Sequence, residues 1–280
     1  MDTKQLQDIA CQVRRDIIRM VNGAKSGHPG GSLGCADFLT ALYFEIMDIN
    51  PDNFTREGVN EDMFFLSNGH ISPVLYSVMA RRGYFPVSEL ASFRKLHTRL
   101  QGHPTPVEGL PGIRIASGSL GQGVSVAVGA ALAKKANNDN HIVYALTGDG
   151  EIQEGQIWEA LMFAAAKKVD NLIVTVDNNG KQIDGPTEDV LDFGDLRAKF
   201  EAFGWTVLDM NGNDMNDCVE TINKAKSLAF NGKPIAIIMK TEMGQGVDYM
   251  MGTHKWHGAA PNDEQAAAAL AQLPVTLGDY

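Results

Sequence analysis

The hydrophobic and polar positions along this chain form helix-like and strand-like segments that alternate. Apolar residues recur at every third or fourth position over residues 5–21, which predicts an amphipathic helix. Further helices are predicted at 35–47, 72–82, 121–136, 155–168, 194–203, 214–230 and 264–272. Short apolar runs typical of buried strands occupy 63–67, 142–146, 172–176, 205–208 and 234–239. The alternation predicts an α/β fold, a doubly wound and mainly parallel sheet with helices on both faces.

No repeat, low-complexity tract or linker interrupts the chain before residue 260. We therefore expect residues 1–280 to form one domain, with a short tail from about residue 261. The stretch 84–117 is irregular and rich in Pro, Gly and His, and long irregular stretches in compact domains are usually functional. The helix at 121–136 is rich in small residues, which permit close packing against another element or another subunit.

The composition excludes several classes of protein. The net charge is −10 and no run of Lys or Arg exceeds two residues, which argues against a nucleic-acid surface. No apolar stretch approaches the length of a membrane span, and the first 20 residues lack the apolar run of a signal peptide. Cys11, Cys35 and Cys218 show no zinc or Cys-x-x-Cys spacing, so we expect reduced thiols and a cytoplasmic protein.

Polar side chains follow two consecutive predicted strands. Asp149, between Gly148 and Gly150, ends one strand, and Asn179 ends the next. In an open parallel sheet ligands bind beyond the carboxyl ends of the strands, so these two end loops can converge on one ion. Carboxylate, amide and carbonyl oxygens suit Mg2+ or Ca2+, and a magnesium ion with few protein ligands takes the rest from phosphate and water.

Each of these two motifs alone would more often be an ordinary turn. Together, with 27 residues between Gly150 and Asn178, they form the pattern typical of thiamine diphosphate sites. The glycines flanking Asp149 would let the backbone approach a diphosphate closely. The segment 118–123 is neither a dinucleotide motif nor a Walker motif; it is a turn that opens a helix, whose N–H groups could face an anion.

Four of the seven histidines lie next to a glycine in predicted loops: His28, His70, His103 and His257. Any one of them would more often be a surface or packing residue. Four in similar settings favour a shared site, because loops carry function. Their spacing does not suit a zinc site on a helix.

These segments resemble the transketolase family, and they occur in the family's order. The stretches that carry the resemblance are 26–34, 67–70, 102–104, 118–123, 148–155, 178–185 and 253–258. The match runs from the first helix to about residue 261. In detail the chain is similar to the N-terminal, diphosphate-binding chain of a split transketolase.

The resemblance implies roles for individual residues. Asp149 and Asn179 would bind the metal through their side chains, and Lys181 through its carbonyl. The residues implied to contact the cofactor are His70, Gly118, Ser119, Leu120, Gly148, Asp149, Gly150, Glu154, Asn179, Ile183 and His257. The implied catalytic groups are His28, His103 and His257, which would face the sugar, and Glu154, which would lie at the subunit interface. Two positions depart from the family: Lys181 replaces a residue that is often apolar, and Ser119 replaces a proline.

The resemblance also implies the reaction and the partners. A two-carbon ketol unit would pass reversibly from a ketose phosphate to an aldose phosphate, with thiamine diphosphate and Mg2+ or Ca2+ as cofactors. The aminopyrimidine half of the cofactor would need a second α/β domain. Because only a short tail follows His257, we expect that domain on a separate C-terminal transketolase subunit, in a dimer of heterodimers.

Other interpretations remain open at this point. The cofactor chain of a 2-oxo acid dehydrogenase would share the Gly-Asp-Gly and Asn-Asn elements, but not the Gly-His-Pro segments at 27–29 and 102–104. A deoxyxylulose-phosphate synthase fragment is disfavoured by the segment 119–123. A transketolase for an unusual branched sugar phosphate is also possible. A degenerate scaffold is disfavoured because Asp149, Asn179 and the four histidines are all present.

Overall fold

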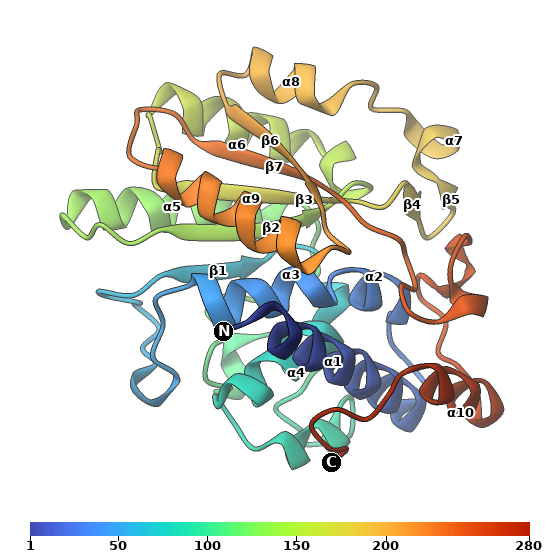
Figure 1. Cartoon of the computed structure of the whole chain (residues 1–280). Helices are drawn as coiled ribbons and strands as arrows, with labels where there is room; N and C mark the ends of the chain where they lie inside the picture. Colours follow the sequence, from blue (N-terminus) through green and yellow to red (C-terminus); the bar gives the residue numbers. More distant parts are fainter.

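The computed structural model describes residues 1–280 and is built around a five-stranded, all-parallel sheet (Figure 1). The strand order is β1-β2-β3-β7-β6. The strands are β1 (Met63–Leu66), β2 (Val143–Gly148), β3 (Leu172–Asn178), β6 (Thr206–Asn211) and β7 (Ile235–Lys240). All five predicted strands are therefore confirmed, and the predicted neighbours β2 and β3 pair directly, with Gly148 opposite Asp177.

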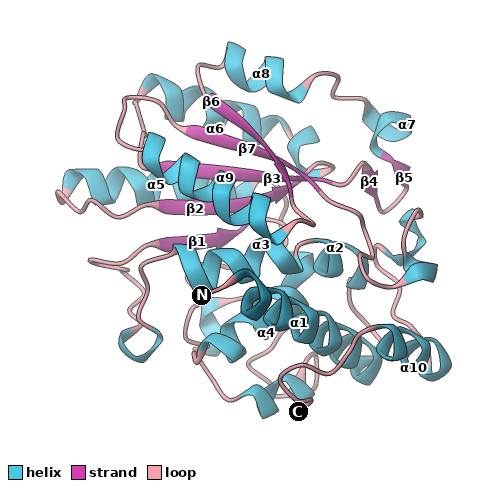
Figure 2. Cartoon of the chain, viewed as in Figure 1, coloured by secondary structure: helices cyan, strands magenta, loops and turns pink.

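Successive side chains of each strand enter two different cores, one on each face of the sheet. In β1, Phe64 belongs to one core and Phe65 to the other. The larger core lies under α1 (Thr3–Ala24), α3 (Ala36–Ala41), α4 (Ser72–Arg82), α9 (Met215–Leu228) and α10 (Asp263–Gln272). The smaller core lies under α5 (Gln122–Ala136), α6 (Gly155–Ala166) and α8 (Leu196–Ala202) (Figure 2). The doubly wound arrangement is thus as predicted.

Helix α1 organises the larger core. It begins with a capping box in which the Asp2 side chain accepts from the Gln5 amide, and its apolar stripe is buried. Asp16 at its centre is fully buried and forms a salt bridge of 2.5 Å with Arg81 of α4. Helix α10 packs against α1, and Arg15 pairs with Asp279 at 2.7 Å. Residues after 261 are therefore packed onto the body of the sheet domain.

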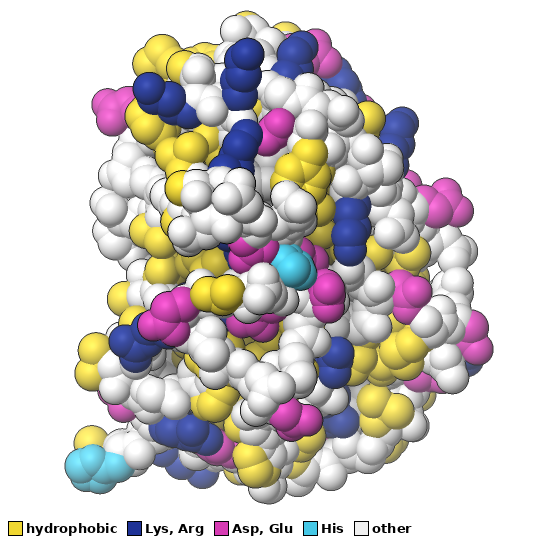
Figure 3. Space-filling model, turned by 90° about the vertical axis from the view of Figure 1, so that its left-hand side faces the viewer, with side chains coloured by type: hydrophobic (Ala, Val, Ile, Leu, Met, Phe, Trp, Pro, Cys, Tyr) yellow, Lys and Arg dark blue, Asp and Glu magenta, His cyan; other side chains and the backbone are white.

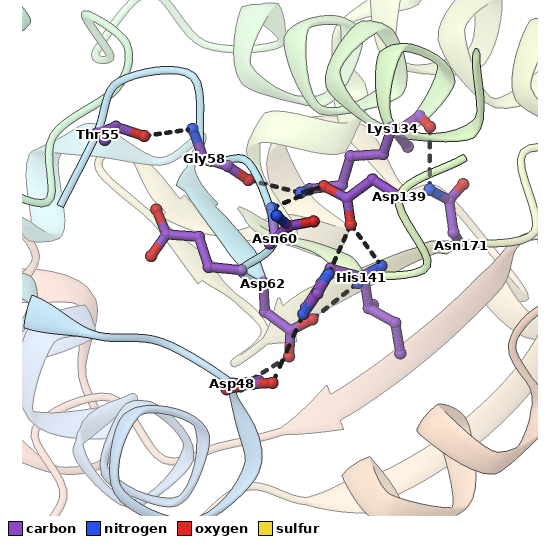
Figure 4. Close-up of polar contacts among 12 residues, drawn as sticks. Asp48, Thr55, Gly58, Asn60, Asp62, Lys134, Asp139, His141 and Asn171 are labelled. Atoms are coloured by element: carbon purple, nitrogen blue, oxygen red, sulfur yellow. Dashed lines mark hydrogen bonds and ion pairs between the residues drawn. The ribbon is translucent and has the colours of Figure 1, made fainter. Parts of the chain in front are cut away.

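A polar network links the loops at the amino-terminal ends of β1 and β2 (Figure 4). These ends are opposite to the carboxyl ends that are followed by Asp149 and Asn179. Asp139 accepts from the Nδ1 side of His141 at 2.6 Å and from Lys134 at 2.8 Å. Asp62 accepts from the amides of Asp48 and Ile142. The network ties the loop before β1 to the loop before β2. On the same side of the molecule, Figure 3 shows acidic and basic side chains interspersed with apolar ones.

Several short elements were not predicted. The glycine-rich segment after α1 folds into α2 (Pro29–Gly34), since Pro29 at the first helical position is preset for a helix. A two-stranded ribbon, β4 (Lys181–Gln182) and β5 (Gly185–Pro186), is followed by α7 (Thr187–Leu191). The predicted helix at 35–47 ends in a π-helical turn, η1 (Leu42–Ile46). The 3-10 turns are η2 (Pro51–Asn53), η3 (Gly69–Ile71), η4 (Val87–Ser92), η5 (Pro106–Glu108), η6 (Glu151–Gln153), η7 (Asp248–Met250) and η8 (His254–Trp256).

None of the helices combines the length and the apolar character needed to cross a bilayer. The stretch 84–117 contains only two short 3-10 turns, as its composition predicted.

Candidate active site

A cleft of about 360 Å³ lies at the carboxyl ends of β2 and β3. In Figure 1 these ends point toward α2 and β4, at the right of the molecule. Twelve of the fourteen predicted site residues line the cleft: His28, His70, Gly118, Leu120, Gly148, Asp149, Gly150, Glu154, Asn179, Lys181, Ile183 and His257. Segments far apart in the sequence therefore meet at the edge of the sheet where the parallel topology predicts a ligand.

Asp149 joins the loops that follow β2 and β3. Its carboxylate accepts hydrogen bonds from the amides of Gly150, at 2.8 Å, and Gly180, at 2.6 Å. Its own amide donates to the carbonyl oxygen of Asp177 at 3.1 Å. The Asp149 side chain is only 2% exposed, so the two loops are held together by a buried carboxylate.

Asn179 has a complementary position in the β3 loop. Its side-chain oxygen accepts from the amide of Lys181 at 3.0 Å, and its side-chain nitrogen donates to Asp177 at 2.9 Å. This fixes which end of the amide faces the Lys181 backbone. Asn179 and Lys181 therefore share one tight turn with Asp149 beside it.

The electrostatics of this turn favour a cation. Burial, and then the neighbouring Asp177 carboxylate, raise the pKa of Asp149 to about 7. Burial also raises the pKa of Asp177, although the hydroxyl of Thr241 and the amide of Asn179 donate to it. Neither carboxylate forms an ion pair with a basic side chain. A positive ion bound between these oxygens would relieve the charge that burial disfavours.

The protein alone does not offer a complete metal site. No group of three or more His, Cys, Asp or Glu side chains is arranged to hold an ion. The oxygens of Asp149 and Asn179, with the nearby backbone, are hard donors of the kind that Mg2+ and Ca2+ prefer. The donor set thus fits an ion that shares its coordination with a ligand phosphate and water.

Glu151 is a site residue that the sequence reasoning missed. Its buried carboxylate accepts four hydrogen bonds, from the hydroxyls of Ser67 and Thr147 and from the amides of Gly121 and Gly148. It therefore connects the end of β1, the glycine-rich loop before α5 and the end of β2. The only signal in the sequence was an acidic residue directly after Gly150. An acidic residue at that position is equally typical of the exposed start of a helix.

Four imidazoles form the second half of the site. The ring centroid of His28 lies 5.1 Å from that of His70, 5.7 Å from that of His257 and 6.4 Å from that of His103. His70 and His257 stack at 5.1 Å. The Nδ1 atoms of His28 and His257 are buried and have no hydrogen-bond partner. The predicted grouping of the four histidines is present, and two of their ring nitrogens have no hydrogen-bond partner within the chain.

The imidazoles are held in their neutral form. Burial, and then the ring of His257, lower the pKa of His28 to about 4 and that of His70 to about 3. Burial lowers the pKa of His103 and of His257 as well. A neutral imidazole has one N–H group that donates a hydrogen bond and one nitrogen that accepts one, which suits it to contacts with sugar hydroxyls.

The depressed pKa of His70 makes the stability of the ligand-free chain depend on pH. Below about pH 6.5 the unfolded state binds a proton at His70 that the folded state refuses until about pH 3, so stability falls as the pH drops through this window. The expected loss by pH 5 is up to about 2 kcal/mol. Urea unfolding at pH 7 and pH 5 should show a smaller loss for His70→Gln than for the wild type. The exposed His97, changed to Gln, serves as the control; an equal loss in all three proteins would contradict this assignment.

Two predicted residues lie outside the cleft lining. Ser119 is exposed, in the loop between Gly118 and Leu120, which both line the cleft. The His103 ring packs against Gly118: a Cβ at Gly118 would lie 2.6 Å from that ring, and the backbone there has φ +119°. Glycine is therefore required at 118, because any side chain would collide with His103 and the backbone conformation favours glycine.

The outer rim of the cleft is open to solvent. Glu154 is exposed, Ile183 is 55% exposed and Leu120 is 38% exposed. Other lining residues that were not predicted from the sequence include Asn68, Gln182 and Met243. The Asn68 side-chain oxygen is buried and has no hydrogen-bond partner in this chain.

The chain matches a known protein family over almost its whole length. Residues 6–276 match the family described as "Transketolase, thiamine diphosphate binding domain". The chain is 40% identical over 261 residues to an apulose-4-phosphate transketolase subunit of Phocaeicola vulgatus, covering 93% of this chain and 90% of that protein. It is 38% identical over 268 residues to a 6-deoxy-6-sulfo-D-fructose transketolase subunit of a Clostridium species, covering 96% of each.

Solved structures show the same fold. The transketolase of Campylobacter jejuni superposes with a TM-score of 0.89 at 36% identity, over 98% of this chain and 43% of the other. The chain thus spans about two-fifths of the length of the transketolases with solved structures that it matches.

These matches define the class of protein as a thiamine diphosphate-binding domain with an α/β fold. The chain belongs to the transketolase family and corresponds to its N-terminal part. The sequence-based predictions of the family, the fold class and a transketolase-type transferase subunit are confirmed.

Proposed function

We propose that this chain is the N-terminal subunit of a thiamine diphosphate-dependent transketolase that moves a two-carbon ketol unit between sugar phosphates. The observation that carries the proposal is the cleft itself. It places the Asp149–Asn179 turn beside a cluster of neutral imidazoles at the ends of two neighbouring strands. One end therefore suits a metal-bound diphosphate, and the other suits a polyhydroxylated substrate.

The metal-binding role belongs to Asp149, Asn179 and the carbonyl of Lys181. Two buried carboxylates without a basic partner support a divalent ion, Mg2+ or Ca2+, as the bridge to the diphosphate. Bound thiamine diphosphate would supply the nucleophilic carbon of the reaction. Gly118, Ser119, Leu120, Gly148, Gly150, Ile183 and His70 would surround the cofactor, with Glu154 at the interface with the other subunit.

The imidazoles would position the sugar and move its protons. His28 and His257 each present a buried Nδ1 without a partner, and His103 lies at the outer edge of the same cluster. An imidazole that is neutral at pH 7 can take a proton from a substrate hydroxyl and return it later. These three residues are the proposed catalytic groups.

His28→Ala and His103→Ala should lower kcat/KM for ketol transfer by roughly 100- to 10,000-fold if each moves or orients a proton. Thiamine diphosphate affinity should remain near that of the wild type, because the hydrogen bonds that hold the Asp149 and Asn179 loops do not involve either residue. The assay is ketol transfer by the chain reconstituted with its partner, with affinity measured by calorimetry. His97→Ala, at an exposed position outside the cleft, is the control. Full activity of both variants would refute the assignment, and absence of transfer by the wild-type mixture would refute the proposed function.

The proposed substrates are a ketose phosphate donor and an aldose phosphate acceptor. A substrate of the kind in the name of the Phocaeicola vulgatus relative, apulose 4-phosphate, is the second candidate, favoured by 40% identity over nearly the whole chain. The other candidates are the sugar phosphates of the pentose phosphate pathway. The candidate substrates are distinguished by comparing kcat/KM for a panel of donors with a single acceptor.

The partner is proposed to be a C-terminal subunit with the pyrimidine-binding domain, in a dimer of heterodimers. Support comes from two relatives that are named as transketolase subunits and are matched over at least 90% of their own length. The single sheet domain of residues 1–280 would form the diphosphate half of each site. Three free cysteines support a cytoplasmic location.

A further inference from the structure

The ion pair between Lys181 and Glu242 joins two walls of the cleft. The Lys181 Nζ lies 3.3 Å from the Glu242 Oε1, and the two side chains are 18% and 39% exposed. Lys181 begins β4, directly after the Asn179 turn. Glu242 lies at the start of the long connection after β7, and this connection leads through Met243 to His257, which both line the cleft. In Figure 1 this connection descends beside β4.

Glu242 is fixed through both its backbone and its side chain. Its amide donates to the Asn213 Oδ1 at 2.7 Å, and the Asn213 Nδ2 donates to the carbonyl of Gly34 at 2.9 Å. Its Oε1 also accepts from the amide of Gly252 at 2.8 Å. The Glu242 Oε1 therefore joins the two ends of the loop 242–252 and also binds Lys181.

The segment that follows Gly252 packs directly on residues of the cleft. A Cβ at Gly258 would lie 3.1 Å from Ile183 and 3.4 Å from the His28 ring. The position of this segment therefore affects the shape of the cleft. The Lys181 amide, for its part, holds the Asn179 oxygen at 3.0 Å. A movement of the Lys181 side chain would thus be transmitted to the Asn179 turn and to the His257 segment together.

We propose that Lys181 and Glu242 are positioning residues that lock the Asn179 turn to the His257 segment and so set the width of the cofactor cleft. The proposal rests on the function proposed above for that turn. Apolar side chains could fill the same space, but they would not bind the Gly252 amide or fix Lys181 in direction. Because the pair is partly exposed, its effect should weaken as salt rises.

Hydrogen exchange of the ligand-free chain tests the lock directly. Lys181→Met and Glu242→Gln should each speed exchange of the amides in 243–257 by roughly three- to tenfold, and the double variant should be no faster than the singles. Glu242→Gln keeps an acceptor for Gly252, so it removes mainly the charge that binds Lys181. Lys181→Arg should restore wild-type exchange. Lys4→Met, which removes the exposed Lys4–Asp8 pair on α1, is the matched control.

Cofactor affinity then decides whether the lock serves the site. In the reconstituted enzyme with Mg2+, both single variants should bind thiamine diphosphate roughly three- to tenfold more weakly, and the control Lys4→Met should bind as the wild type does. Unchanged exchange, or additive effects in the double variant, would overturn the lock. Faster exchange with unchanged affinity would overturn the positioning role. A wild-type mixture that binds no thiamine diphosphate would instead refute the proposed function, since exchange is measured without any ligand.

Discussion

Asp149→Ala should lower the affinity of the reconstituted enzyme for thiamine diphosphate by more than roughly 100-fold in the presence of Mg2+, because even groups that only orient a metal ligand are worth 10- to 100-fold. The Asp149 carboxylate is buried beside Asp177, and neither has a basic partner. Removing it takes away the main negative charge through which an ion could bridge to the diphosphate. Chelation of the metal should have the same effect on the wild type.

The measurement is calorimetric titration with thiamine diphosphate, with and without Mg2+. Asp149→Asn separates charge from structure, because its carbonyl oxygen can still accept one of the bonds from Gly150 and Gly180. It should bind more tightly than Asp149→Ala and more weakly than the wild type. Asp52→Ala, at an exposed position in η2, is the control. If affinity survives both the alanine substitution and chelation, the metal site is not at Asp149.

Without its partner, this chain should catalyse ketol transfer at a rate at least roughly 1,000-fold below that of the mixture. A half-assembled site neither orients the reacting groups nor supplies preorganised charge to the transition state. The cleft is open on the side of Ile183 and Leu120, and the exposed Glu154 lies on its rim. A cofactor held only at its diphosphate end would leave its reactive ring in water.

The test follows C2–H exchange of thiamine diphosphate and ketol transfer while the partner chain is added stepwise. Activity should rise until the two chains are equimolar and then stay constant. The isolated partner is the matched control and should also be inactive. Turnover by this chain alone at the rate of the mixture would contradict the half-site interpretation.

The elements that the sequence predicted well are those with a long or strongly apolar pattern. The apolar runs in β2 and β3 show in the sequence where each strand ends, and Asp149 and Asn179 follow directly after these ends. The parallel pairing of Gly148 with Asp177 then brings the two residues together, as the alternation of strands and helices implied. The four histidines could be grouped because each lies beside a glycine in a loop.

The features that were missed depend on contacts between distant segments. Glu151 gains its role from Ser67, which is 84 residues away, and no local pattern reports that bond. The ribbon of β4 and β5 has only two residues in each strand, too few for a period to be visible. Helix α2 consists largely of glycine and serine, and it is stable because its neighbours bury all six residues. In each case tertiary packing overrides a weak local preference.

The cleft has a consequence for how the chain folds. Its lining comes from separate stretches that span residues 28 to 257, and they meet only after the parallel strands have paired. Pairing of this kind closes long loops and has a high contact order, which makes it slow compared with local helix formation. A collapsed intermediate with most of its helices in place would still lack the arrangement of Asp149, Asn179 and the imidazoles. Cofactor binding in this chain therefore reports completion of the whole sheet, and a ligand that binds only this state shifts the folding equilibrium toward it.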